Sequence, residues 1–296
     1  MISVKDVVRA AVVAAALLLA AGAVQAVVIE TVPVGNPGNA ADATGYGAVD
    51  HNYKIGKYEV TTGQFVEFLN FHHHHTHISF TPPSYFPGGN HITQSGSGTT
   101  DDPYIYSVDP EYANNPVAYV SFWDACRFVN WLNNGQGDGD AESGAYTLND
   151  YNGSAGGDIS RNPGARWVIP TVDEWYKAAY YSGDATAGYY ATPTASAYGT
   201  VDQYGNGWEW SESVGIGDSC AGRILGGGLV GINVDFKGTS LGDPSYSSGP
   251  SLPWEDYEIP AEGGGGFGFR VGEVPEPATL GLLALGGAAL VRRRRT

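Results

Sequence analysis

The stretch Arg166-Trp167-Val168-Ile169-Pro170-Thr171-Val172-Asp173-Glu174-Trp175 runs from an apolar segment through a proline into a helix-start signal. Thr171 and Glu174 have the spacing of a capping box, in which the two side chains satisfy backbone N–H groups that the first helical turn leaves unbonded. A helix that begins within this box is therefore predicted over residues 173–181.

Two other places in the chain carry the same capping signal, Thr61 with Gln64 and Ser121 with Asp124. They predict helices over 63–70 and 122–133. The second helix has apolar residues spaced by three and four, so one of its faces should enter a core. These residues are Phe122, Ala125, Cys126, Val129 and Leu132.

Short strands and long loops make up the rest of the expected structure. Segments 27–34, 53–60 and 266–271 are the strand candidates, because each is short and bounded by turn residues. With 43 glycines and 17 prolines, the composition is typical of short elements joined by irregular segments. The longest loops are expected over 71–115, 135–165 and 231–266. Loops of this length are often functional, although their glycine- and serine-rich parts are also typical of flexible filler.

The first 26 residues have the layout of a secretory signal peptide. Lys5 and Arg9 are basic, residues 10–21 are apolar, and Val24-Gln25-Ala26 ends in a small residue. We predict cleavage by signal peptidase after Ala26. The remaining chain is long enough for one domain or at most two. A single domain over 27–272 is the simpler interpretation.

The C-terminal segment, residues 273–296, has the layout of a sorting tail. Pro275-Glu276-Pro277 is followed by an apolar run over 278–291 and by four arginines, 292–295. A spanning helix needs about 20 apolar residues, so this short transmembrane segment should anchor the chain only transiently, with the arginines on the cytoplasmic side. The tail resembles the PEP-CTERM signal, and this resemblance implies that a membrane protease, the exosortase, recognises and cuts it. An ordinary tail anchor with a fortuitous Pro-Glu-Pro is the alternative.

The exported part of the chain is strongly acidic. Without Lys5, Arg9 and the four terminal arginines, 9 of the 15 basic residues remain; without Asp6, 30 of the 31 acidic residues remain, for a net charge near −21. Nucleic acid and anionic lipid are poor partners for such a chain. We therefore predict no nucleic-acid partner, and membrane contact only through the tail before cleavage. Cation binding and simple solubility are both compatible with the acidity.

The chain has only two cysteines, Cys126 and Cys220, so it is not a disulfide scaffold. The position of Cys126 on the apolar helix face predicts a buried, inert thiol. A bridge between the two stays open, because sequence does not establish the proximity that a disulfide needs.

Seven short phrases occur in the order found in the formylglycine-generating enzymes, also called the sulfatase-modifying-factor domain. The resemblance covers roughly residues 30 to 272 and implies a C-type-lectin-like fold, an α+β single domain rich in loops. The phrases are Tyr58-Glu59-Val60-Thr61, Asn115-Pro116-Val117 with Val120-Ser121-Phe122-Trp123-Asp124-Ala125, Arg166-Trp167-Val168-Ile169-Pro170-Thr171, Asp173-Glu174-Trp175, Tyr204-Gly205-Asn206-Gly207-Trp208-Glu209-Trp210, Gly226-Gly227-Gly228 and Gly268-Phe269-Arg270-Val271.

The resemblance also defines what an oxidising member of this family needs. Such members use a cysteine pair, late in the domain, that holds copper and activates oxygen. Here the corresponding interval, 229–266, contains no cysteine, and Gly226, Leu229 and Val230 stand where the family usually has arginine, serine and tryptophan. Copper held by thiolates depends on soft sulfur ligands, so we predict no catalytic residues and no copper.

A calcium site is the second property that the resemblance implies. In the family a calcium ion lies in the loop of the Gly-Asn-x-Trp-Glu-Trp phrase. The matching positions are Asp202, Gly205, Gly207 and Glu209. They supply two carboxylates and two backbone carbonyls, which are oxygen ligands of the kind calcium prefers. In the alternative, Trp208 and Trp210 are core anchors and Glu209 only caps the turn.

A run of histidines, His72, His73, His74, His75 and His77, follows the first predicted helix. Neutral imidazoles bind zinc, copper and nickel. A specific site also needs fixed spacing and surrounding groups that orient the rings. The run is therefore interpreted either as a metal-capturing loop or as a solvated loop that binds nickel adventitiously.

These observations predict an exported, non-catalytic protein of the cell envelope or extracellular matrix, with a binding or structural role at the envelope polysaccharide. Aromatic residues on the long loops fit this function, because aromatic faces stack on sugars; core packing is the alternative for most of them. The alternative is a divergent metal-dependent oxidoreductase of the formylglycine-generating type that modifies proteins. The aromatic candidates are Tyr104, Tyr106, Tyr189, Tyr190, Trp254 and Tyr257.

Overall fold

The structure is a computed structural model, and it describes ten stretches of the chain. They are residues 26–42, 45–71, 91–137, 139–151, 159–181, 195–203, 208–214, 223–227, 257–258 and 267–275.

Three helices form where the capping signals predict them: α2 (Thr62–Phe71), α3 (Phe122–Asn133) and α4 (Val172–Tyr180). The box at α4 is complete, since the Glu174 N–H donates to Thr171 Oγ1 and the Thr171 N–H donates to Glu174 Oε2. Thr61 and Gln64 make the same reciprocal bonds at α2. At α3 the N–H of Asp124 bonds to Ser121 Oγ, but the hydroxyl of Ser121 donates to the Asp124 carboxylate instead.

The sheet that carries both ends of the domain has the strand order β1-β2-β10-β5, with every pair antiparallel. Its strands are β1 (Thr31–Val34), β2 (Tyr53–Gly56), β10 (Gly272–Glu273) and β5 (Trp167–Val168). β1 and β2 are shorter than the predicted strands 27–34 and 53–60. β10, the last strand within the described residues, thus lies between an early strand and a middle one.

A second sheet has the strand order β8-β7-β6-β9. Its strands are β6 (Trp208–Val214), β7 (Arg223–Gly227), β8 (Tyr257–Glu258) and β9 (Phe267–Gly268). The single strand predicted over 266–271 is wrong. Phe267 and Gly268 pair with β6, Val271 accepts the N–H of Gly56, and pairing in the first sheet begins at Gly272. This end of the chain therefore passes from one sheet to the other.

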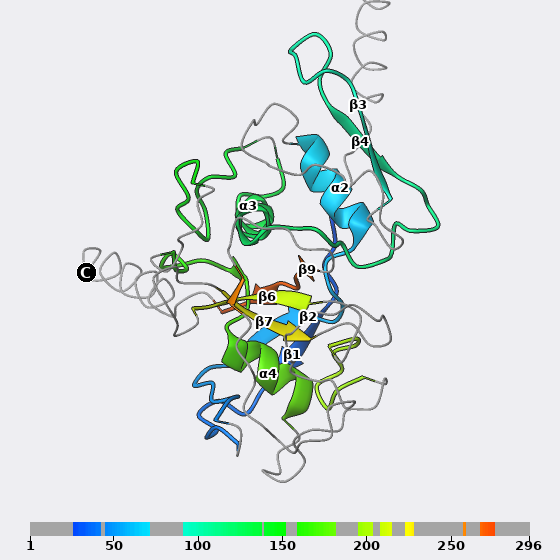
Figure 1. The fold of residues 1–296 in the computed structure, drawn as a ribbon. Helices are drawn as coiled ribbons and strands as arrows, with labels where there is room; N and C mark the ends of the chain where they lie inside the picture. The colour runs from blue at the N-terminus through cyan, green and yellow to red at the C-terminus, as the bar shows by residue number, and fades with distance from the viewer. Residues whose placement is uncertain are drawn as a thin grey trace, which may run out of the picture.

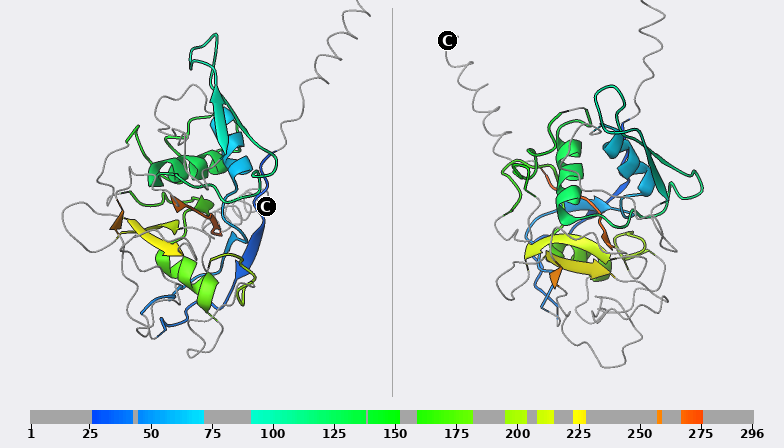
Figure 2. Two further views of the ribbon diagram at one scale, coloured as in Figure 1. Left: turned by 45° about the vertical axis from the view of Figure 1, so that its right-hand side comes forward. Right: turned by 45° about the horizontal axis from the view of Figure 1, so that its top comes forward.

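A projecting hairpin, β3 (Ile92–Ser95) and β4 (Ile105–Val108), lies in the segment 71–115 that we predicted as a loop. Both strands are short, and most of their side chains are exposed or polar, so they lack a clear hydrophobic alternation. In Figure 1 the hairpin stands beside α2, at the edge of the molecule. The views in Figure 2 agree with this position.

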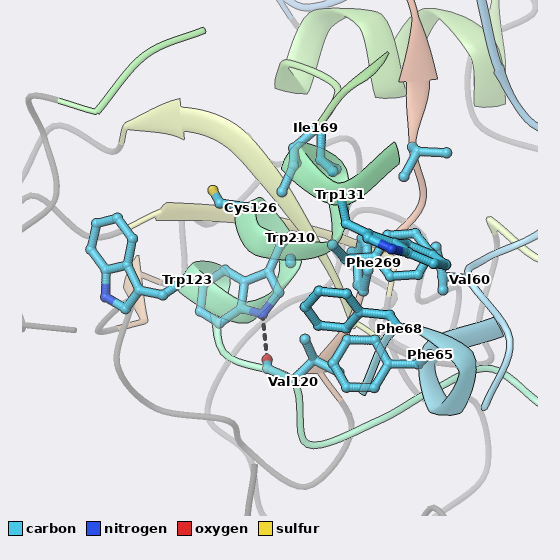
Figure 3. Packing of buried hydrophobic residues seen from close by; sticks show 14 of the residues in the cluster. Val60, Phe65, Phe68, Val120, Trp123, Cys126, Trp131, Ile169, Trp210 and Phe269 are labelled. Carbon is cyan, nitrogen blue, oxygen red and sulfur yellow. Dashed lines mark hydrogen bonds between the residues drawn. The ribbon is translucent and has the colours of Figure 1, made fainter. Parts of the chain in front are cut away.

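The elements are layered, with α2 and α3 on one side of the strands and α4 on the other (Figures 1 and 2). Between α2 and α3 lies an aromatic core that Figure 3 shows from close by. Phe65 stacks on Phe128 with ring centroids 6.0 Å apart, and Phe128 meets Phe269 edge-on at 5.3 Å. The indole of Trp210 donates to the Val120 carbonyl at 2.7 Å. Residues from distant parts of the chain thus complete one core.

Helix α3 is buried on nearly all of its faces, although only one apolar face was predicted. Cys126 lies in the core, as expected from its position. The polar residues are paired inside the protein: Arg127 bonds to Glu142, and the side-chain amide of Asn130 donates to the carbonyls of Ala141 and Tyr146. The irregular segment 139–151 is therefore held against the helix by polar contacts.

No helix within the described stretches is long and apolar enough to cross a membrane. The predicted signal peptide, apart from its last residue, and the predicted tail segment 278–291 lie outside those stretches.

Candidate functional site

Glu209 of β6 and Arg270, two residues after β9, form a completely buried ion pair. The Arg270 Nε and Nη2 atoms each lie 2.7 Å from one carboxylate oxygen of Glu209. Trp175 of α4 donates its indole N–H to the same carboxylate at 2.8 Å. Glu209 and Arg270 are 0 % exposed and Trp175 is 1 % exposed. Two parallel bonds fix the geometry of an arginine–carboxylate pair. Together with the bond from Trp175, this pair joins α4 to β6 and to the segment that follows β9.

Arg270 also donates to three backbone carbonyls. Nη1 bonds to Gly56 at 2.8 Å and Lys57 at 3.1 Å, and Nη2 bonds to Val201 at 3.1 Å. Burial by itself would lower the pKa of Arg270, but the charge of Glu209 and the bonds to it outweigh burial and raise that pKa. The guanidinium therefore stays charged and joins three parts of the chain, namely residues 56–57, Val201 and Glu209 of β6.

A second polar network surrounds the start of α4. Arg161 donates through Nη1 and Nη2 to Glu174 at 3.1 and 2.9 Å, and through Nε to Glu212 at 2.6 Å. Glu212 also accepts the hydroxyl of Tyr146 at 3.1 Å. Burial again opposes the charge of Arg161, but the two carboxylates raise its pKa above the ordinary value.

His51 extends this network to the surface. Its Nε2 lies 3.0 Å from Glu174 Oε1 and its Nδ1 lies 2.8 Å from Asp50 Oδ1, while its side chain is 40 % exposed. Burial tends to raise the pKa of Glu174, yet the bond to His51 and the charge and bonds of Arg161 bring it down to about 2. The hydrogen bond to Glu174 raises the pKa of His51 in spite of partial burial. The partly exposed imidazole of His51 therefore keeps its proton to a higher pH than a free histidine does.

Half of the predicted calcium set lies in the described stretches. Asp202 is exposed and has a left-handed backbone conformation with φ 63°. The Glu209 carboxylate is buried and accepts hydrogen bonds from Arg270 and Trp175. Three hydrogen bonds leave that carboxylate with about one free acceptor position, next to a guanidinium that repels a cation. Among the described residues, no group of three or more His, Cys, Asp and Glu side chains is arranged to hold a metal. Gly205 and Gly207 lie outside those stretches, and the calcium site stays a prediction.

Only some of the other predicted histidine, cysteine and aromatic candidates lie in the described stretches. The histidines from 72 to 77 and Cys220 lie outside the described residues, as do Tyr189, Tyr190 and Trp254. The interpretation of Tyr106 as a sugar-stacking residue is wrong, because its side chain is 9 % exposed and belongs to the core cluster. Tyr104 is 36 % exposed on the hairpin and keeps the predicted accessibility.

The network around His51 was missed in the sequence. His51 precedes Glu174 by 123 residues, and Glu212 follows Arg161 by 51 residues, so no local pattern joins them. Glu174 was recognised only as a helix cap. The family phrases carried the one available signal for the other network, since Trp175, Glu209 and Arg270 all belong to them.

Comparison with known families identifies the class of protein. Residues 13–193 match the family described as "Sulfatase-modifying factor enzyme 1-like domain", and residues 273–295 match the PEP-CTERM protein-sorting motif. The chain belongs to the sulfatase-modifying factor enzyme 1-like family. It is an α+β, loop-rich single domain of the formylglycine-generating-enzyme type, with a C-type-lectin-like fold. The sorting motif marks it as an exported protein that an exosortase processes and that its C-terminal segment anchors transiently.

Two solved structures are similar to the chain at low identity. One is titled "Treponema denticola variable protein 1", with 17% identity and a TM-score of 0.47 over 85% of this chain and 97% of that one. The other is titled "Crystal Structure of CarF", with 17% identity and a TM-score of 0.48 over 84% of this chain and 99% of that one. A comparison with curated proteins found no match.

Proposed function

We propose that this exported protein is a non-catalytic component of the cell envelope or extracellular matrix, with a binding or structural role at the envelope polysaccharide. The observation that carries the proposal is the position of the family's characteristic residues. Trp175, Glu209 and Arg270 are buried and bonded to one another, so they support the fold and present no reactive group to solvent.

The lack of cysteines late in the domain also supports a non-catalytic role. The interval 229–266 has no cysteine, whereas the oxidising chemistry of the family depends on thiolates that hold copper. If the protein were instead a divergent oxidoreductase, the purified domain would retain about one copper or iron ion per chain. Metal analysis therefore separates the two functions.

The projecting hairpin supports a binding role through Tyr104. A Cβ atom at Gly98 would lie 2.5 Å from the Tyr104 ring, and Gly98 has φ +74°, so only glycine lets the ring lie against the hairpin loop. A ring fixed on one face and 36 % exposed loses little side-chain entropy when a sugar stacks on it. The hydroxyl groups of Ser97, Thr99 and Thr100 lie in the same exposed loop.

Retention of native envelope polysaccharide by residues 27–274 tests this function, first with calcium and then with a chelator. We expect saturable retention that Tyr104→Ala weakens by about tenfold, which corresponds to the loss of one aromatic contact of roughly 1 to 1.5 kcal/mol. Tyr58→Ala is the matched control. Tyr58 is 44 % exposed, but the Lys57 ammonium lies 5.1 Å from its ring centroid.

Each outcome has a separate meaning. Retention that the chelator abolishes would support the calcium site predicted at Asp202, Gly205, Gly207 and Glu209. Equal retention by the parent and Tyr104→Ala would exclude the hairpin ring as the contact. No retention in either condition would exclude polysaccharide binding and favour a purely structural role.

A further inference from the structure

The sorting tail leaves the folded domain without a linker. Glu273 is the last residue of β10, in the middle of the sheet, and it pairs with Lys54 of β2 and Trp167 of β5. Pro275, the first residue of the Pro-Glu-Pro triplet, follows two positions later. The point where the domain ends is therefore also the point where the processing signal begins.

This exit point is held firmly in the fold. The Glu273 carboxylate accepts bonds from Lys54 Nζ at 2.9 Å and from Arg166 Nε and Nη2 at 2.9 and 2.6 Å. The N–H of Val274 donates to the Arg166 carbonyl at 2.8 Å. Release of β10 from the sheet would break these bonds together with its backbone pairing to β2 and β5.

The tether to the membrane is short compared with the domain. Ala278, the first residue of the apolar run, lies five residues after Glu273, and five extended residues reach at most about 18 Å. The headgroup layer takes up about 5 to 8 Å of that distance. A globular domain of this size has a diameter of roughly 45 Å. While the tail is inserted, Glu273 and the face that carries it therefore stay within about 10 to 13 Å of the headgroups.

Among the lysine and arginine side chains described over 45–181 and 267–275, the two most exposed lie on the same face. The side chains of Arg166 and Lys54 are 57% and 52% exposed. By comparison, Lys57 is 30% and Arg161 is 22% exposed, and Arg127, Lys177 and Arg270 are buried. Among these side chains, the two that solvent reaches most therefore lie together where the tail leaves the fold.

These two cations keep donors for a further partner. Only Nε and Nη2 of Arg166 and one donor of Lys54 are used by Glu273, out of five and three donors respectively. The Arg166 guanidinium also lies 5.9 Å from the ring centroid of Trp167. Tryptophan, lysine and arginine are the residues that favour the membrane–water interface.

We propose that the exit face, defined as Lys54, Arg166, Trp167 and Glu273, docks on the lipid headgroups of the bilayer while the sorting tail is still attached. Lys54 and Arg166 contact headgroup phosphates, and the acidic remainder of the domain is directed away from the membrane. This face is thus an exception to the expectation from net charge that only the tail contacts lipid. The processing protease then meets its Pro-Glu-Pro signal between a docked domain and the bilayer.

The test uses residues 27–296 reconstituted by their own tail into vesicles of phosphatidylcholine with a minority of phosphatidylglycerol. Cys220→Ser removes one thiol, and a single fluorescent label is placed at Pro33→Cys or at Ser97→Cys. Pro33 is exposed and lies opposite Lys54 in the strand register, whereas Ser97 is in the hairpin loop. We expect a quencher attached to lipid headgroups to quench the label at position 33 and to leave the label at position 97 bright.

Charge removal tests the role of the cations. Each of Lys54→Gln and Arg166→Gln should lower the docked-to-undocked ratio about fivefold, as expected for one cation at an anionic surface. Lys57→Gln is the matched control and should leave the ratio unchanged. Near-ultraviolet circular dichroism checks that the variants stay folded, and added salt should reproduce the loss in the unmutated chain.

Three results would overturn the proposal. One is equal quenching at positions 33 and 97. Another is quenching at position 33 that neither charge removal nor salt changes, since the tether alone would then explain the orientation. The third is quenching that appears only when the vesicles contain the processing protease, which would assign the exit face to a protein partner.

Discussion

The side-chain amide of Asn70 bonds to both backbone groups of Tyr106. Its Nδ2 donates to the Tyr106 carbonyl at 2.9 Å, and its Oδ1 accepts the Tyr106 N–H at 2.9 Å. A backbone neighbour in a sheet would make the same two bonds. Asn70, at the end of α2, thus stands in for a strand on the outer edge of β4 and fixes the hairpin to the body of the domain.

Replacing this residue should loosen the hairpin without unfolding the domain. Asn70→Leu removes both bonds and leaves two backbone groups unpaired, so the local opening free energy should fall by about 1 to 3 kcal/mol. Hydrogen exchange at the Tyr106 amide measures it. Thr93→Val, which removes an exposed contact with Ser107 in the same hairpin, should change exchange much less.

The Glu209–Arg270 pair should be costly to break from one side. Arg270→Met leaves a buried carboxylate without its counter-charge, and we expect a loss of about 3 to 5 kcal/mol in the free energy of unfolding. Denaturant unfolding measures this loss. Adding Glu209→Gln should recover part of it, because the neutral amide still accepts the Trp175 indole N–H. A double variant that is no more stable than the single one would contradict this explanation.

An exposed ion pair provides the comparison. Arg166→Met removes the two bonds to Glu273 from a side chain that is 57% exposed. Solvent screens such pairs, so the unfolding free energy should fall by at most about 1 kcal/mol.

Glu174 should make the domain sensitive to acid. Its pKa in the folded state is lowered to about 2, so its stabilising effect is complete above the ordinary carboxyl range and is lost as the pH falls toward 2. The free energy of unfolding should fall by on the order of 3 kcal/mol over this range. Unfolding measured across this range should show a flatter pH dependence for Glu174→Gln than for the parent. An unchanged slope would mean that other carboxylates control acid unfolding.

His51 should act in the opposite direction. Its pKa is raised in the folded state, so the stabilisation from its protonated form is complete below the ordinary imidazole pKa and is lost as the pH rises through the folded-state value. His51→Gln should therefore be less stable than the parent at mildly acidic pH and similar to it at alkaline pH. The difference should stay below about 1 kcal/mol because the side chain is 40% exposed. Asp50→Asn should weaken the trend without removing it.

The helices were predictable because their signals are local. Each capping pair lies within four residues, and the observed helices begin within one residue of the predicted starts. The hairpin was not predictable in this way, since Ile92–Ser95 is mostly polar and its position depends on Asn70. The division of 266–271 between two sheets was also hidden, because it follows from pairing with Trp208 and Ile55.

The sites depended even more on contacts between distant residues. The family phrases pointed to Glu209, but its role in the structure is set by Arg270, which lies 61 residues away. The electrostatic surroundings of His51 are likewise set by Glu174. Sequence alone thus identified residues whose side chains could bind metal or react. The fold determined which of these side chains are paired inside the protein and which remain accessible to solvent.

The position of β10 has a consequence for biogenesis. The strand at residues 272–273 lies between β2 and β5. The sheet β1-β2-β10-β5 therefore stays incomplete until almost all of the domain has crossed the membrane. We expect the chain to remain competent for translocation throughout that passage, and to fold only when the sorting tail reaches the bilayer. Protease resistance of export intermediates of increasing length measures this order, and resistance gained well before residue 272 emerges would contradict it.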